Sequence, residues 1–130
     1  MIKKVKFLAK EARLRLTYMT NKDCIFCKLI NGEIPPKFVY EDDKTVAFAD
    51  INPIAETHIL IVPKKHIESV ERISTGDGEI LVAMFSVAKK LVSDAGLDSF
   101  RLAFNGGKFQ HVGHLHMHLV AGQKIEWKKL

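Results

Sequence analysis

The spacing of apolar residues predicts one long helix and one fully buried strand. From Ile80 to Val92 apolar residues recur at helical spacing, which predicts an amphipathic helix that ends at Gly96. Residues 58–62 form a nearly continuous apolar and β-branched run, as expected of a central strand that is buried on both faces. Pro63 ends this run because proline cannot donate to a strand ladder.

Shorter patterns predict the other elements. Turn-forming pairs such as Asp42-Asp43 and Asn52-Pro53 separate the strand-like segments. A short helix over about 24–31 has Asp23 as its cap and Asn31-Gly32 at its end, residues 66–73 are helix-like, and 75–78 read as a turn. The fold class is therefore α+β: an antiparallel sheet of about five strands with the helices mostly on one side. The remaining strands are predicted at 38–41, 45–50, 100–104 and 112–120.

Composition and charge change this picture only at the N-terminus. The chain has 130 residues, 47% of them hydrophobic, which suits one globular domain. The net charge of +5 is carried by residues 1–18, which hold six basic residues and one acidic residue, while the rest of the chain is balanced. No apolar run approaches the ~18 residues of a membrane-spanning helix. We therefore expect neither nucleic acid nor membrane as a partner of the core domain.

Residues 1–22 are expected to be a basic extension, and residues 23–130 the folded domain. The extension lacks the apolar core of a secretory signal. An organelle-targeting or membrane-surface helix, an added helix and a frayed segment all stay open, and Met19 is an alternative start.

Three histidines alternate with apolar residues near the C-terminus. On a strand, His114, His116 and His118 would share one face, while the intervening Leu115, Met117 and Leu119 would point into the core. Aligned imidazoles at this spacing indicate either a metal site or nucleophilic and acid-base chemistry.

The segment HLHMHLV resembles the histidine triad (HIT) motif, in which three histidines alternate with apolar residues. The upstream stretch that begins CIFCKLINGEIPP and continues through FADINP to THILIVPKKHI resembles the Hint-type branch of the same family. The resemblance covers most of residues 23–127. It implies a five-stranded antiparallel sheet, a homodimer with a joined ten-stranded sheet, purine nucleotide binding and hydrolysis of nucleoside 5′-phosphoramidates.

The resemblance also implies roles for individual residues. His116 matches the nucleophile, His118 is a candidate proton donor or oxygen contact, and His58 matches a histidine of the proton relay. Asp50 matches the carboxylate that binds the ribose hydroxyls, and Asn105 matches an asparagine on the phosphate and leaving-group side. The apolar base pocket maps to Phe26, Leu29, Ile34, Phe48 and Ile51.

The loop before the triad departs from the family pattern. It is short, Gln110 is retained, and His111 replaces a serine-like phosphate contact. Phosphate binding by the backbone N–H groups of His111 and Val112 is still expected, whereas the leaving-group preference stays open.

Cys24 and Cys27 form the only CxxC pair, at the spacing of a structural zinc site. The resemblance adds His66 and His114, which completes a Cys2His2 set for a structural Zn²⁺; free thiols are the alternative. No redox cofactor is expected, because the βαβ context of a thioredoxin-like motif is missing. A reducing cytoplasmic location is the default for such thiols, with organelle targeting left open by the basic segment.

Three other functions compete with phosphoramidate hydrolysis. They are hydrolysis of dinucleoside polyphosphates, a non-catalytic nucleotide-binding or scaffold role, and a cupin-type metal enzyme. Ala121-Gly122 after the triad and Trp127 match the Hint type, and the cupin reading lacks a further clustered Glu and His. Turnover of an AMP-amine substrate would discriminate between the enzyme and the scaffold.

Overall fold

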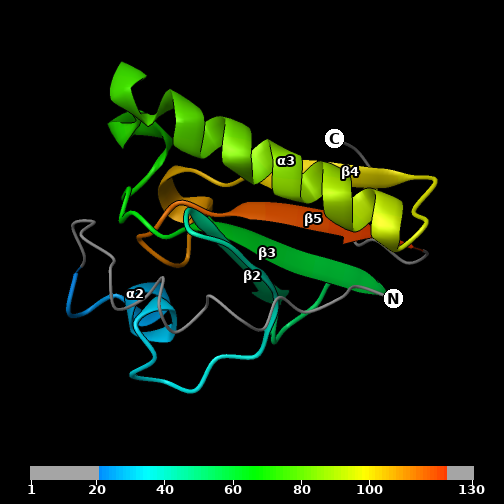
Figure 1. Ribbon diagram of the computed structural model, residues 1–130, viewed down its shortest axis with the longest axis horizontal. Helices are drawn as coiled ribbons and strands as arrows, with labels where there is room; N and C mark the ends of the chain where they lie inside the picture. Colours follow the sequence, from blue (N-terminus) through cyan, green and yellow to red (C-terminus); the bar gives the residue numbers. More distant parts are fainter. Residues whose placement is uncertain (1–20, 123–130) are drawn as a thin grey trace.

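One five-stranded antiparallel sheet forms the centre of the molecule in the computed structural model, which describes residues 21–122 (Figure 1). The order across the sheet is β1-β2-β3-β5-β4, and every neighbouring pair is antiparallel. The predicted α+β class and strand number are confirmed. The strands are β1 (Phe38–Glu41), β2 (Thr45–Ala49), β3 (Thr57–Pro63), β4 (Phe100–Phe104) and β5 (Met117–Ala121).

The long helix α3 (Gly78–Asp94) covers one face of this sheet (Figure 1). Its stripe residues Met84 and Leu91 are fully buried against Ile61 of β3 and Met117 of β5. Gly96 follows with a φ of 63°, the left-handed conformation that glycine adopts after a helix end. The predicted helix and its stop are therefore confirmed.

The short helix α2 (Ile25–Ile30) packs on the opposite face of the sheet. Phe26 and Ile30 join a cluster with Leu60 and Val62, which alternate along β3 with the residues that face α3. The prediction that helices lie mostly on one side is therefore wrong for this helix. Its N-cap is Cys24 and not Asp23, since the Cys24 sulfur accepts from the backbone N–H of Cys27.

Two other segments differ from the prediction. Residues 66–73 hold only the single 3-10 turn η1 (Val70–Arg72), because the Ile67 carbonyl accepts from Leu115 N–H at 2.6 Å instead of starting a helix. The last strand begins at Met117 rather than at 112, since its ladder to β3 stops at the pair Ile61 and Met117, two residues before Pro63. Two more 3-10 turns, η2 (Thr75–Asp77) and η3 (Gly107–Phe109), precede α3 and residues 110–116 respectively.

The central and edge strands differ in exposure. β3 is buried along nearly its whole length, as its apolar run predicted. β4 lies at one edge of the sheet, and residues of β4 and α3 line a groove of about 430 Å³. Phe85 and Phe100 line this groove and are 51% and 44% exposed. Within residues 21–122, none of the helices combines the length and the apolar character needed to cross a membrane.

Candidate active site and metal centre

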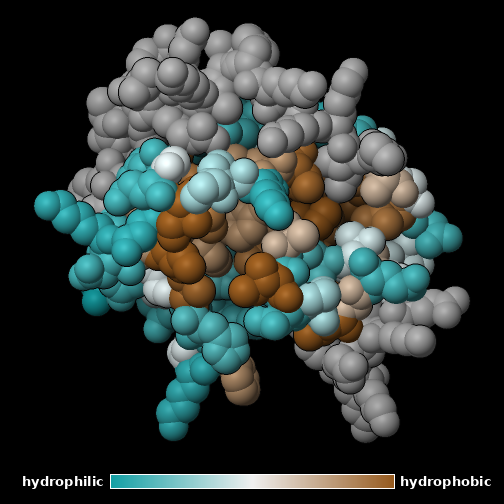
Figure 2. Space-filling model, turned by 90° about the horizontal axis from the view of Figure 1, so that it is seen from below, coloured by the Kyte–Doolittle hydropathy of each residue, from teal (hydrophilic) through white to brown (hydrophobic). Residues whose placement is uncertain are grey.

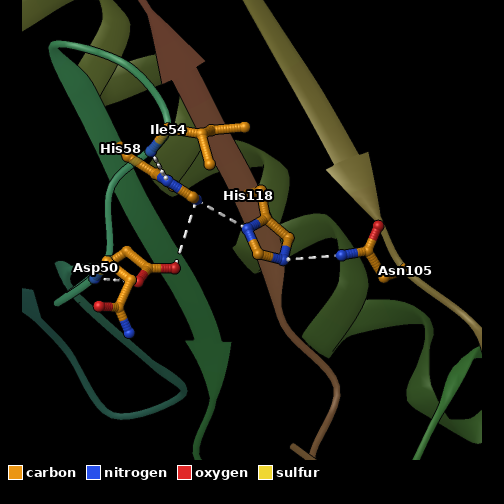
Figure 3. A network of polar contacts seen from close by, with 6 residues as sticks. Asp50, Ile54, His58, Asn105 and His118 are labelled. Atoms are coloured by element: carbon orange, nitrogen blue, oxygen red, sulfur yellow. Dashed lines mark hydrogen bonds and ion pairs between the residues drawn. The ribbon is translucent and has the colours of Figure 1, made fainter. Parts of the chain in front are cut away.

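A chain of polar contacts joins residues on or just after four neighbouring strands, on the sheet face that carries α2 (Figure 3). His58 on β3 places Nε2 2.8 Å from Nδ1 of His118 on β5. Asp50, just after β2, has Oδ2 3.4 Å from the same Nε2 atom of His58. Beyond His118, the Nε2 atom lies 3.4 Å from the side-chain amide of Asn105, which follows β4. The structure thus brings together four of the residues singled out from the sequence.

His116 lies beside this chain, one residue before β5. The His116 and His118 ring centroids are 4.9 Å apart, and the rings of Phe26 and His116 pack nearly perpendicular with their centroids 5.3 Å apart. The Nδ1 atom of His116 is 2.8 Å from the carbonyl oxygen of His114. A carbonyl only accepts, so Nδ1 carries the proton and Nε2 keeps its lone pair. His116 is therefore held in the tautomer that a nucleophile needs.

Burial keeps these imidazoles neutral. It is the largest cause that lowers the pKa of His58, His116 and His118, in the last case to about 4. The neighbouring histidines lower the pKa of His118 further, while the Asp50 carboxylate acts in the opposite direction. Near neutral pH the site therefore holds uncharged rings, which can attack or donate a hydrogen bond without first losing a proton.

Apolar side chains gather in a patch on this face of the molecule, seen from below in Figure 2. Phe26 packs edge-on against Phe48 with a centroid distance of 5.4 Å, and Leu29 and Val112 pack on the same cluster. Ile51 lies outside the cluster and is 91% exposed, while Ile34 is half-buried and also outside it. Four of the predicted pocket and loop residues therefore form one apolar surface next to His116.

The loop on the phosphate side is pinned by Gln110. Its side-chain amide donates to the carbonyl oxygens of Glu68 at 2.8 Å and Val112 at 2.9 Å, so this amide holds the backbone in place. Within residues 21–122, no group accepts a hydrogen bond from the backbone N–H groups of His111 and Val112. The exposed His111 lies close enough to lower the pKa of both His116 and His118. Free N–H donors at this point suit an anionic oxygen.

The four predicted metal ligands also meet in one place. Cys24, Cys27, His66 and His114 each offer one ligand atom, and these atoms all lie within 4.8 Å of one another. The Nδ1 atoms of the two histidines are 3.1 Å apart. Three of the four Sγ···Nδ1 distances, those of Cys24–His114, Cys27–His66 and Cys27–His114, run from 3.3 to 3.6 Å. A tetrahedral zinc site with usual bond lengths has N···N edges of roughly 3.4 Å and N···S edges of roughly 3.6 Å. The arrangement therefore fits a tetrahedral ion.

The tautomer of His114 also suits a metal ligand. Its Nε2 atom is 2.7 Å from the carbonyl oxygen of Pro63, so Nε2 carries the proton and Nδ1 faces the cysteines with its lone pair. Burial lowers the pKa of His114 to about 4 and raises the pKa of the Cys27 thiol to about 11 when no ion is present. A divalent cation would reverse the latter effect, because it favours the thiolate.

Known proteins resemble this chain in sequence and in architecture. A family model described as "Scavenger mRNA decapping enzyme C-term binding" matches residues 23–129. A histidine triad protein from Clostridium difficile superimposes with a TM-score of 0.79 at 44% identity, covering 85% of this chain and 100% of that one. The purine nucleoside phosphoramidase of Escherichia coli is 41% identical over 108 residues, which are 80% of this chain and 91% of that protein. The chain belongs to the histidine triad family.

A further relative, named for zinc binding, bears on the cysteine cluster. The 14 kDa zinc-binding protein of Zea mays is 42% identical over 123 residues, covering 91% of this chain and 94% of that protein. The predicted family and its five-stranded fold are thus confirmed. Trp127 and residues 1–20 lie outside the described residues, so the predictions made for them and for the domain boundary stay predictions.

Two groups of this HIT site were missed from the sequence because they are backbone atoms. They are the carbonyl oxygen of Pro63, which orients His114, and the N–H of Ile54, which contacts His58 at 3.2 Å. The resemblance implies a main-chain carbonyl of the triad strand beside His116, and the carbonyl oxygen of His114 lies in that place. Every residue except proline has such an N–H group and every residue has such a carbonyl, so side-chain chemistry gives no signal for them.

Proposed function

We propose that this HIT protein is a nucleotide hydrolase that cleaves purine nucleoside 5′-phosphoramidates through a covalent nucleotidyl-histidine. The observation that carries the proposal is the tautomer of His116. The His114 carbonyl holds the Nδ1 proton, which leaves Nε2 as a neutral nucleophile beside the chain of Asp50, His58 and His118. The Escherichia coli relative, named for this activity, supports the choice of substrate class.

The reaction splits into two displacements at phosphorus. The His116 Nε2 lone pair forms a bond to the α-phosphorus as the phosphorus–nitrogen bond of the substrate breaks, and the departing amine takes up one proton from the solvent. Water then forms a bond to the same phosphorus, the bond to His116 breaks, and the water releases one proton. The two steps together consume one water and yield an amine and a nucleoside monophosphate.

The surrounding residues would orient the nucleotide. A carboxylate accepts from both hydroxyls of a ribose, which is the role we assign to Asp50. The apolar surface of Phe26, Leu29 and Phe48 provides a place for the purine. The N–H groups of His111 and Val112 would bind a phosphoryl oxygen, with Asn105 on the leaving-group side.

We also propose that Cys24, Cys27, His66 and His114 bind a structural Zn²⁺. The tetrahedral spacing and the Pro63 contact of His114 support this, as does the zinc-binding relative from maize. The ion would cross-link α2 to the segment before β5, with no part in the chemical steps. Such thiols stay reduced in the cytoplasm, which is the location we assign. A zinc content below about a tenth of an equivalent in purified protein would contradict the assignment.

A second copy of the chain is the proposed partner at the edge strand β4. The half-exposed Phe85 and Phe100 flank this edge and the groove beside it. Antiparallel pairing of β4 with its counterpart would cover both rings and extend the sheet to ten strands, as the family resemblance implies.

The decisive experiment measures turnover of a fluorogenic AMP-amine substrate and the mass of trapped protein. We expect the wild-type protein to turn the substrate over and to form an adduct on the His116 peptide that is heavier by one adenylyl group, which is AMP less one water. His116→Ala should lose roughly 10⁴-fold or more in kcat/KM and show no adduct. Lys90→Ala, which removes an exposed lysine of α3, serves as the control variant.

Two other outcomes would point to the competing functions. Faster turnover of dinucleoside polyphosphates than of phosphoramidates would reassign the enzyme to a polyphosphate hydrolase. Tight AMP binding without turnover or adduct in wild type would overturn the hydrolase in favour of a nucleotide sensor or scaffold.

A further inference from the structure

The chain of histidines in Figure 3 ends at a backbone donor. The N–H of Ile54 lies 3.2 Å from Nδ1 of His58. A backbone N–H can only donate, so this Nδ1 must accept and the proton of neutral His58 sits on Nε2. That proton points at Nδ1 of His118, 2.8 Å away, and leaves the proton of His118 on its own Nε2.

The opposite direction of the hydrogen-bond chain would bring two N–H groups into a clash. If Asn105 donated to His118, then His118 would donate to His58, and His58 would have to carry its proton on Nδ1. Two N–H groups would then face each other at the Ile54 end. Asn105 can present either end of its amide, since a half-turn exchanges oxygen and nitrogen. The direction is therefore decided at Ile54.

We propose that the backbone N–H of Ile54 sets the direction of this hydrogen-bond chain, so that His118 presents its Nε2–H to the leaving-group side of the site. Ile54 and His58 are then positioning residues, and His118 is the group that touches the substrate. The inference deepens the proposed phosphoramidate hydrolysis and rests on it for the identity of the leaving group.

The direction determines what His118 can do. A protonated ring would also carry a proton on Nδ1 and would lose the bond from His58, so the contact resists protonation. Burial acts in the same sense, and the charged or titratable groups near His118 are Asp50, His58, His111 and His116. His118 thus stabilises the leaving group as a neutral hydrogen-bond donor, a role that a buried neutral imidazole can fill.

The loop between β2 and β3 aims the Ile54 donor. Asp50 Oδ1 accepts from the backbone N–H of Asn52 at 2.8 Å, which shapes the turn that follows β2. Pro53 fixes the next φ angle. The turn returns the chain so that the N–H of Ile54 meets a side chain four residues ahead, at the start of β3.

Tautomers can be read without substrate from long-range ¹H–¹⁵N correlations of ¹⁵N-histidine-labelled full-length protein. In wild type at pH 7.5 we expect both His58 and His118 to carry the proton on Nε2. A proton on Nδ1 of either ring would overturn the inference, whether or not the protein is a hydrolase. The expected tautomers in a protein without turnover would uphold the inference and reject the proposed function.

Removal of the donor provides the second test. Ile54→Pro lacks the backbone N–H, so we expect a measurable share of His118 to shift its proton to Nδ1 and kcat to fall roughly 5- to 10-fold at unchanged KM, the equivalent of one net hydrogen bond. Ile54→Ala keeps the N–H, and both rings should stay protonated on Nε2. A tautomer shift in the alanine variant but not in the proline variant would overturn the role of the backbone donor. The wild-type spectrum decides the question if the proline variant does not fold.

Discussion

Asp50 contacts both the relay and the turn that positions it, through Oδ2 at 3.4 Å from His58 and Oδ1 at 2.8 Å from the N–H of Asn52. As the proposed ribose ligand it would also distinguish ribose from 2′-deoxyribose, because the second sugar lacks one of the two hydroxyl donors. A single side chain would therefore join sugar recognition to the orientation of the histidines.

Asp50→Asn tests this role. The amide keeps the shape but removes the charge that strengthens the sugar contacts, so we expect KM for the AMP-amine substrate to rise roughly tenfold or more. The preference for ribo- over 2′-deoxy-substrate should fall toward unity. The comparison of the two substrates on wild type and variant checks this, with the exposed Asp43→Asn as control. An unchanged sugar preference would contradict the ribose assignment.

His118 is also expected to make the stability of the protein depend on pH. Its pKa is lowered from 6.5 to about 4 in the folded protein, mainly by burial. Between these values the unfolded chain binds the proton more readily than the folded one. The free energy of unfolding should therefore fall as the pH drops from 6.5 toward 4, and the stabilising contribution of neutral His118 should be fully present above pH 6.5.

Denaturant titrations at several pH values measure this slope. His118→Gln cannot titrate, so its stability should depend on pH less steeply than that of wild type across the window, by up to one bound proton. Both proteins need the same zinc content, because the neighbouring metal ligands also take up protons at low pH. Equal slopes would show that the pKa of His118 is not lowered.

Among the elements, the segment of residues 111–116 stands out because it carries His116 without a strand ladder. His114 at its centre reaches the cysteines of α2, and the Leu115 N–H bonds to Ile67. The carbonyl of His114 also orients His116. A metal bound to His114 would therefore help to keep the nucleophile His116 in position.

Removal of zinc should therefore loosen this segment first. We expect a chelator to speed amide hydrogen exchange in residues 111–116 more than in β5, and to lower turnover before the protein unfolds globally. Exchange measured by mass spectrometry on metal-loaded and chelated protein checks this, with Cys27→Ser as a variant that weakens the site. Uniform faster exchange over the whole chain would mean that the ion only stabilises the global fold.

At the scale of the whole molecule, the apolar groove beside β4 determines the expected assembly. Phe100→Lys places a charge where the proposed partner copy would pack, so we expect a dimer of wild type to become a monomer at micromolar concentration. Sedimentation velocity measures the mass. Ile25→Lys changes a residue of comparable exposure, 50% against 44%, on the opposite face and should leave the dimer intact. A monomeric wild-type protein would contradict the proposed homodimer.

Local patterns were enough to predict most of the fold. The helical stripe up to Gly96, the apolar run of β3 and the turn pairs between strands each reflect the chemistry of neighbouring residues. One error arose where a distant contact replaced a local one, since Leu115 takes the carbonyl of Ile67. Another was a local choice between neighbouring residues, because Cys24 and not Asp23 caps α2.

For this protein, the sequence by itself determined the residue types of the site, the family and the alternation that sends Leu115, Met117 and Leu119 into the core. Only the tertiary structure decided which nitrogen carries the proton in His58, His114 and His118, and it placed the His114 carbonyl where the family resemblance implies one for His116. The tautomers depend on backbone groups of His114, Pro63 and Ile54. These groups are the same in almost every residue, so only their position in the folded chain gives them a role.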